Sequence, residues 1–254
     1  ANTVTPRISS AVVAADNATI AVTMNETVFN ATGGSGNLEA SDFALTLSGG
    51  AATLGSSTPT SISKSGNVYT LGMNISGTPT GFEEITVIPV DNSIYDASNN
   101  EASTNQVMNQ DYLTDKVGPT IYSTVVGANN SNVVVTFSDA VFNSSSGSGA
   151  LEASDFTVSV SGGTASAVAI SSVSVSGSVV TLGITISGVA NGSETITVTP
   201  AANSVYDNYG NAAGTSQSNN TATLKDGRIL VVNGLMHHSG QGYDNKIVRM
   251  NKDR

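Results

Sequence analysis

Six acidic residues set among polar neighbours have the chemistry of calcium ligands. Hard cations such as calcium prefer carboxylate and amide oxygens, which loops rich in Asp, Glu and Asn supply. The sequence has no EF-hand spacing such as D-x-D-x-D-G, and calcium would bind with the weak affinity of extracellular modules, on the order of 10⁻⁴ to 10⁻³ M. The candidate ligands are Glu26, Asp42, Asp96, Asp139, Asp155 and Asp207. Calcium is the only cofactor to which the residue types point.

The same cluster of Asn, Tyr and Asp occurs twice, as NSIYDASNN in residues 92–100 and as NSVYDNYGN in residues 203–211. Two interpretations remain open for its aspartates, Asp96 and Asp207. Each can accept hydrogen bonds from backbone N–H groups two residues on and so close a structural turn, or each can ligate calcium. Asn99 stands where the second copy has Gly210. Because Asn tolerates a positive φ better than most residues, we expect the turn in both copies.

Further acids lie where the two copies join. Asp111 and Asp115 precede the dipeptide Gly118-Pro119, which punctuates the boundary. An ion bound to these carboxylates would stiffen the junction, whereas a solvated linker charge needs no ion. Asp226 occupies the position equivalent to Asp115 at the end of the second copy, so we expect an acid at every junction.

No arrangement of residues typical of an enzyme is visible. His237 and His238 are the only source of an imidazole base, and adjacent residues on a strand point to opposite faces. The motifs G-x-S-x-G and H-E-x-x-H and the P-loop are absent. Glu83 and Glu84 also face opposite ways, and our alignment replaces the first of them by Ser193 in the second copy. We therefore predict that the protein is not an enzyme.

These residues belong to a segment that is copied once along the chain. Residues 25–50 match 138–163, residues 68–77 match 179–188, and residues 83–96 match 193–207 with one residue of slack. Internal repetition on this scale indicates duplicated structural units. We predict three parts: a first repeat over 1–115, a second over 116–224, and a basic tail over 225–254.

Apolar residues alternate within each copy, as half-buried strands require. In the first copy the inward sets are Ile20, Val22 and Met24; Phe43, Leu45 and Leu47; Leu71, Met73 and Ile75; Ile85 and Val87. The second copy has the corresponding sets at Val133, Val135 and Phe137; Phe156, Val158 and Val160; Leu182, Ile184 and Ile186; Ile196 and Val198. About seven such strands in roughly 110 residues are typical of an Ig-like β-sandwich. The predicted fold class is all-β, with two tandem Ig-like sandwiches and a short C-terminal hairpin-like segment.

Composition and charge exclude several classes. Cysteine is absent, so a disulfide framework and a Cys-based metal site are excluded. Residues 1–224 carry three basic and sixteen acidic residues, a net charge of −13, and the last thirty residues carry a net charge of +3. An acidic body does not neutralise phosphates, so nucleic-acid binding is not expected. No apolar run is long enough to insert into a membrane.

The ordered motifs VTFSDAVFN, LEASDF, SGSVVTLGITISG, ETITVTP and VYDNYGNAA resemble the tandem bacterial Ig-like repeats of surface-layer proteins and adhesins. The resemblance covers about 220 residues. It implies an extracellular, cell-surface location and, in some members, calcium. The tail, KDGRILVVNGLMHHSGQGYDNKIVRMNKDR, resembles a single delta-60 repeat, a β-propeller-like unit. One such unit cannot close a propeller, so we expect a longer natural chain or a tail that docks elsewhere.

The resemblance and the repetition together predict a non-enzymatic extracellular structural protein, a surface or filament component built of spacer modules. Self-association or binding to other cell-surface proteins is the expected partnership, and the basic tail is a plausible strand donor to an acidic body. Two alternatives stay open. One is an adhesin that binds a glycan or a cell-surface partner, although seven Tyr and no Trp offer few stacking rings. The other is an accessory region of a larger secreted enzyme.

Overall fold

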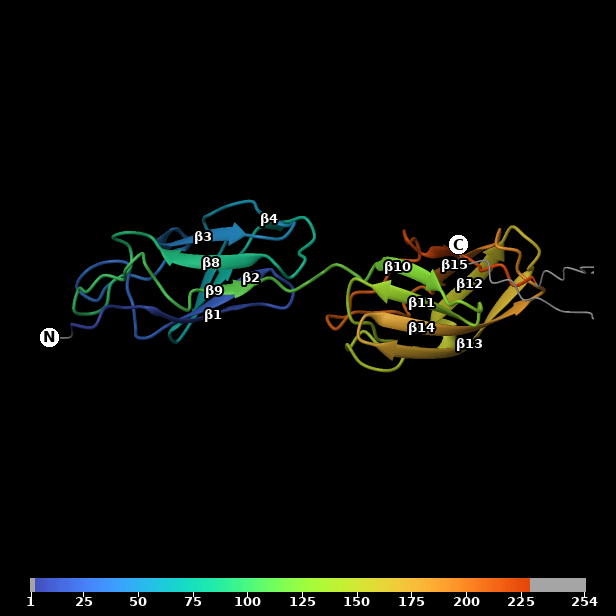
Figure 1. The fold of residues 1–254 in the computed structure, drawn as a ribbon. Helices are drawn as coiled ribbons and strands as arrows, with labels where there is room; N and C mark the ends of the chain where they lie inside the picture. The colour runs from blue at the N-terminus through green and yellow to red at the C-terminus, as the bar shows by residue number, and fades with distance from the viewer. Residues whose placement is uncertain (1–2, 229–254) are drawn as a thin grey trace, which may run out of the picture. The chain divides into compact units, whose positions relative to one another are not determined.

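The computed structural model describes residues 3–228, and the chain divides into two compact units, Ala1–Val117 and Gly118–Arg254. Each unit is built almost entirely of antiparallel strands (Figure 1), so the predicted all-β class is confirmed. The predicted C-terminal hairpin-like segment, with His237 and His238, lies outside the described residues. No helix in the described part is long and apolar enough to cross a membrane.

The first unit contains nine strands and one short 3-10 helix. Four strands form a sheet in the order β1-β2-β6-β5, three form a second sheet in the order β3-β8-β9, and β4 pairs with β7. Their bounds are β1 Ile8–Val13, β2 Thr19–Met24, η1 Ala40–Asp42, β3 Phe43–Ser48, β4 Thr53–Leu54, β5 Ile62–Ser65, β6 Val68–Gly72, β7 Ile75–Ser76, β8 Glu84–Pro89 and β9 Gln110–Tyr112.

The second unit repeats this plan with seven strands. Its sheets have the orders β10-β11-β14-β13 and β12-β15-β16. The bounds are β10 Ile121–Val126, β11 Asn132–Phe137, η2 Ala153–Asp155, β12 Phe156–Ser161, β13 Ala167–Ser176, β14 Val179–Ser187, β15 Thr195–Pro200 and β16 Thr221–Thr223. The count of about seven strands is therefore met in this unit and exceeded in the first.

The extra strands of the first unit come from two interruptions. The sequence predicts one strand through Leu71, Met73 and Ile75, but β6 ends at Gly72 and β7 begins at Ile75. In the second unit the corresponding β14 is continuous, and β13 is continuous where the first unit has β4 and β5. The break follows from the two residues that the first copy carries in excess, which form a loop at 55–61.

Each unit encloses its own apolar core between the two sheets. The predicted inward residues of β2 are all buried, as are Phe43 and Leu45 on the facing sheet. Aromatic rings meet across the core in both units, but they come from different strands. Phe43 packs on Tyr69 of β6 with ring centroids 6.1 Å apart, whereas its equivalent Phe156 packs on Phe137 of β11 at 6.4 Å.

Candidate functional site

Each unit buries three carboxylates at equivalent positions, and these are the strongest candidates for functional groups. The first unit has Asp42, Glu83 and Asp96, and the second has Asp155, Glu194 and Asp207, all at most 9% exposed. A buried charge is costly unless hydrogen bonds satisfy it. In the described residues no buried side-chain nitrogen or oxygen lacks a hydrogen-bond partner. What each carboxylate binds therefore decides its role.

Glu83 binds backbone N–H groups from two separate segments. Its Oε1 accepts from Ala51 at 2.7 Å and from Ala52 at 3.0 Å, after β3, and its Oε2 accepts from Thr80 at 2.8 Å, before β8. Burial raises the pKa of Glu83, but the hydrogen bonds from Ala52, Thr80 and Ala51 outweigh it and lower the pKa to about 2. The ionised carboxylate thus holds two loops together.

Glu194 is the true counterpart of Glu83, and our alignment of Glu83 with Ser193 was wrong. Its Oε1 accepts from Thr164 at 2.7 Å and from Ala165 at 3.0 Å, and its Oε2 accepts from Asn191 and Gly192, both at 3.0 Å. Burial raises the pKa of Glu194, and the backbone hydrogen bonds lower it to about 2. Sequence reasoning missed this pair because it allowed a residue of slack. A strict offset of 111 residues aligns the two glutamates.

The repeated aspartate closes a turn on its own side of the chain. Asp96 Oδ1 accepts from the backbone N–H groups of Ser98 and Asn100, each at 2.8 Å, and Oδ2 accepts from the Asn100 side-chain amide at 2.8 Å. Burial raises the pKa of Asp96, and the hydrogen bonds, the Asn100 side chain first, bring it below its usual value. The structural-turn interpretation is thus observed directly.

Asp207 makes the same bonds in the second copy, to Tyr209 and Asn211 N–H and to the Asn211 amide, each at 2.8 Å. Asn99 and Gly210 occupy the position that needs a positive φ, with φ of 65° and 84°. The expectation that Asn99 preserves the turn is confirmed.

Asp42 and Asp155 fix short helical turns before the third strand of each plan. Asp42 Oδ2 accepts from the backbone N–H of Glu39 at 2.7 Å, and Asp155 Oδ2 accepts from Glu152 at 2.7 Å. Burial raises the pKa of Asp42 more than the Glu39 backbone hydrogen bond lowers it, and the Glu39 charge raises it further. Both carboxylates act as reciprocal caps of η1 and η2.

The remaining predicted ligands lie nearer the surface. Glu26 accepts from the Asn25 amide at 3.3 Å, and Asp139 accepts from the Ser138 hydroxyl at 2.6 Å. Within residues 3–228 no three His, Cys, Asp or Glu side chains gather as a metal-binding group. The structure therefore does not bring Glu26, Asp42 and Asp96, or their counterparts, to one point, and calcium binding stays a prediction.

The junction acids also bind main-chain groups. Asp111 Oδ2 accepts from the Val13 N–H of β1 at 2.8 Å, and Asp115 Oδ1 accepts from Val117 N–H at 2.8 Å. Asp226 repeats the role of Asp115 by accepting from Arg228 N–H at 2.9 Å. These three acids terminate or brace strands of their own unit.

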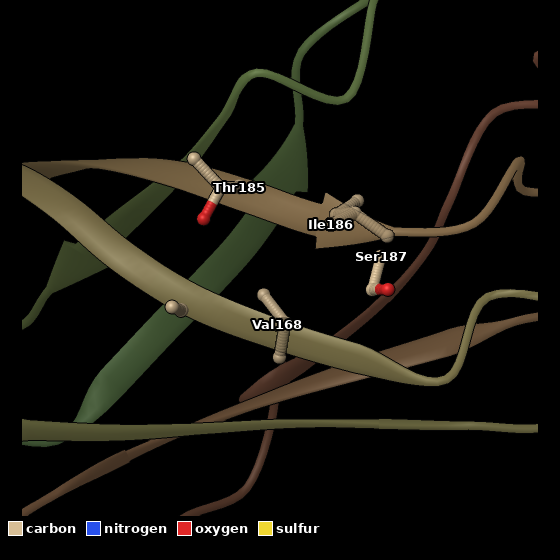
Figure 2. Close-up of a pocket in the computed structure, with 5 residues that line it drawn as sticks. Val168, Thr185, Ile186 and Ser187 are labelled. Atoms are coloured by element: carbon tan, nitrogen blue, oxygen red, sulfur yellow. The ribbon is translucent and has the colours of Figure 1, made fainter.

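Concave surface in the described part consists of shallow hollows. One lies at the start of β13 and the end of β14, where Val168 faces Thr185, Ile186 and Ser187 (Figure 2). Two more occupy equivalent places, one in each unit, around Asn17 and Asn130 at the turn after the first strand. None of the six candidate calcium ligands lines any of these three hollows.

Comparisons with known proteins give two distant structural similarities. No protein-family model matches this chain, and no curated protein matches it. The crystal structure of the N-terminal part of the bacterial S-layer protein SbsC is 17% identical over 80% of this chain and 42% of its own, with a TM-score of 0.33. FdeC, an Escherichia coli adhesin, is 15% identical over 90% of this chain and 65% of its own, with a TM-score of 0.37. The chain thus spans less than two thirds of either structure.

Proposed function

We propose that this protein is a non-enzymatic extracellular structural protein, a cell-surface or filament component, whose two β units serve as spacer modules and self-associate. The observation that carries the proposal is the duplication of the buried-carboxylate framework. Glu83 and Glu194, like Asp96 and Asp207, spend their hydrogen-bonding capacity on backbone N–H groups of their own unit. Buried charges held in this way support the fold.

The places where the chain leaves each unit support a spacer role. The Asn17 side chain accepts from Thr114 N–H at 2.8 Å and donates to Thr114 C=O at 2.7 Å. Asn130 makes the same two bonds to Lys225, at 2.8 and 2.7 Å. Each exit is therefore fastened to the first hairpin of its own unit. A module that transmits load through its ends needs such anchoring.

The resemblance to tandem bacterial Ig-like repeats supports a location at the cell surface. Immunogold electron microscopy with antibodies against the full chain tests this on intact and permeabilised cells of the source organism. We expect label on intact cells, in a continuous layer or on filaments. Label that appears only after permeabilisation would contradict the proposal.

Exposed aromatic rings favour a second candidate function, an adhesin. Phe82 is 76% exposed and Tyr122 is 75% exposed, and such rings can stack on sugars. A glycan array probed with the full chain and with F82A and Y122A variants separates the candidates. Binding that a ring substitution abolishes would establish the adhesin, and a blank array would favour the spacer.

A further inference from the structure

The outermost strand of the second unit presents an unprotected edge. β13 has ten residues and pairs with β14 along one side only, at the end of the sheet order β10-β11-β14-β13. The other side of β13 exposes backbone N–H and C=O groups that another strand can pair with. Its sequence, AVAISSVSVS, contains no charge and no proline, so it lacks the usual features that keep edges apart.

The equivalent edge of the first unit is protected. The chain breaks between β4 and β5, with Pro59 in the intervening loop, and Ser57 C=O of that loop accepts from Leu45 N–H of β3 at 2.7 Å. Lys64 puts a charge on β5, with its Nζ 5.4 Å from the Tyr69 ring centroid. The second unit has lost the two residues that make this loop, and its edge is continuous as a result.

The opposite side of each unit is closed by side chains. In the first unit Ile8 N–H of β1 donates to Gln106 Oε1 at 2.8 Å, and Val13 N–H donates to Asp111. In the second unit Ile121 N–H of β10 donates to Gln217 Oε1 at 2.8 Å. Among the edges compared here, β13 therefore offers the longest uninterrupted row of main-chain groups.

A bulge keeps the apolar residues of β13 on one face. Val168 and Ile170 lie opposite Ile186 and Ile184, and the register shifts between Ile170 and Ser172. Beyond the shift, the inward pairs are Val173 with Leu182 and Val175 with Val180. The extra residue resets the alternation. Ala169 and Ser174 are exposed.

The side-chain pattern of β13 is self-complementary. Read from either end, it places small residues outermost, an apolar residue at each second and fourth position, and serine in the centre. An antiparallel copy with the two-fold axis between Ser171 and Ser172 sets Val168 opposite the second copy's Val175, and Ile170 opposite its Val173. Only serines, including the bulged residue, then meet at the axis.

We propose that β13 pairs antiparallel with β13 of a second copy of this chain in that register, joining two sheets into one. The proposal rests on the self-association included in the proposed function and names its surface. Two copies of net charge −10 repel each other, and an uncharged contact strand avoids opposing like charges across the ladder. Val175, 38% exposed, would lie beside the hollow around Val168 shown in Figure 2.

A matched pair of lysine substitutions in the full chain tests the surface. Ser174 on β13 and Ser63 on β5 are equivalent and exposed, so S174K and S63K make the same change in net charge. Sedimentation velocity from micromolar to about millimolar concentration measures the dimer dissociation constant. We expect S174K to raise it about tenfold or more, because an edge lysine blocks pairing. S63K should leave it unchanged. Equal effects of the two variants would overturn the proposal.

Cysteine cross-linking tests the register, because the chain contains no cysteine of its own. Ala169 faces the second copy's Ser174, so a mixture of A169C and S174C chains should form a disulfide under mild oxidation, while either chain alone should not. A mixture of S63C and S174C is the control. A dimer that cross-links only in the control mixture would place self-association elsewhere and overturn the β13 pairing. A chain that stays monomeric throughout would overturn self-association itself.

Discussion

The Glu83 side chain occupies the space in which a Cβ atom on Gly50 would lie, and Glu194 stands in the same relation to Gly163. The two glycines also have positive φ, 57° and 60°. The Gly-Gly pair that ends LSGG and VSGG is thus required both by its backbone conformation and by the carboxylate beside it. Each unit depends on this contact because it brings the loop after the third strand of the plan onto the glutamate.

Replacing Gly50 with Ala should destabilise the first unit by more than backbone strain alone. Gly66 is a matched control, since its φ of 61° is nearly the same but open space surrounds its Cβ position. We expect G66A to cost about 1 kcal/mol, the strain of a left-handed alanine. G50A should cost roughly 3 kcal/mol or more, because the methyl group displaces the carboxylate from its N–H donors. Urea denaturation measures both. Equal costs would show that the contact with Glu83 is dispensable.

The lowered pKa of Glu83 and of Glu194 predicts acid sensitivity. Both fall to about 2 in the folded protein, below the ordinary value of 4.5. A carboxyl group with a depressed folded pKa stabilises the fold above its unfolded pKa, and this stabilisation is lost as the pH falls toward the folded pKa. Stability should therefore decline between about pH 4.5 and pH 2. Asp96, whose pKa is also lowered, adds to the decline, and Asp42, whose pKa is raised, opposes it.

Urea midpoints measured across this pH range test the assignment with E83Q and E194Q. Each variant should melt lower than the parent at pH 7, by roughly 5–15 °C in its own unit, because the amide cannot replace the charged acceptor. Each should also show a shallower decline in stability below pH 4.5. A variant with the parent's pH dependence would assign the acid sensitivity to other carboxylates.

Sequence periodicity predicted the strands well because alternation reports directly on burial. Ile20, Val22 and Met24 on β2 lie inward as predicted, and the αL position of Asn99 followed from residue type alone. The interruption near Met73 was missed because it arises from a loop inserted elsewhere in the sequence. Glu83 was missed because its partners are main-chain groups of distant segments, which leave no residue-type pattern.

The two cores predict a compensating exchange of large and small side chains. The first unit has Met24 and Tyr69 where the second has Phe137 and Val180, and in each unit one aromatic ring packs on the phenylalanine of the facing sheet. Y69V should cost about 2–4 kcal/mol through the cavity it leaves. Adding M24F, which alone should overpack the core, should recover about 1 kcal/mol or more. Additive costs in the double-mutant cycle would show that the two sites do not share the space.

Met108 is the residue with the least suitable backbone conformation in the first unit. Its φ is +59° and its side chain is 66% exposed, and the equivalent residue in the second unit is Asn219, with φ +57°. The conformation is imposed by the next residue, because Asn109 accepts from Val87 N–H through its carbonyl and donates to Val87 C=O through its amide. M108N should therefore stabilise the unit by about 1 kcal/mol, and N219M should destabilise the other by a similar amount. Unequal signs are the essential result.

The calcium prediction is tested by thermal melts of the full chain with calcium and with a chelator. In the turns of Asp96 and Asp207 each Oδ1 already accepts two backbone N–H groups and each Oδ2 an amide N–H. A cation would have to displace these donors, because a donor hydrogen and a metal ion compete for the same lone pairs. We therefore expect the same melting temperature with millimolar calcium as with chelator. D96N should lower it equally in both conditions. A rise with calcium that D96N abolishes would show that the turn opens to ligate the ion.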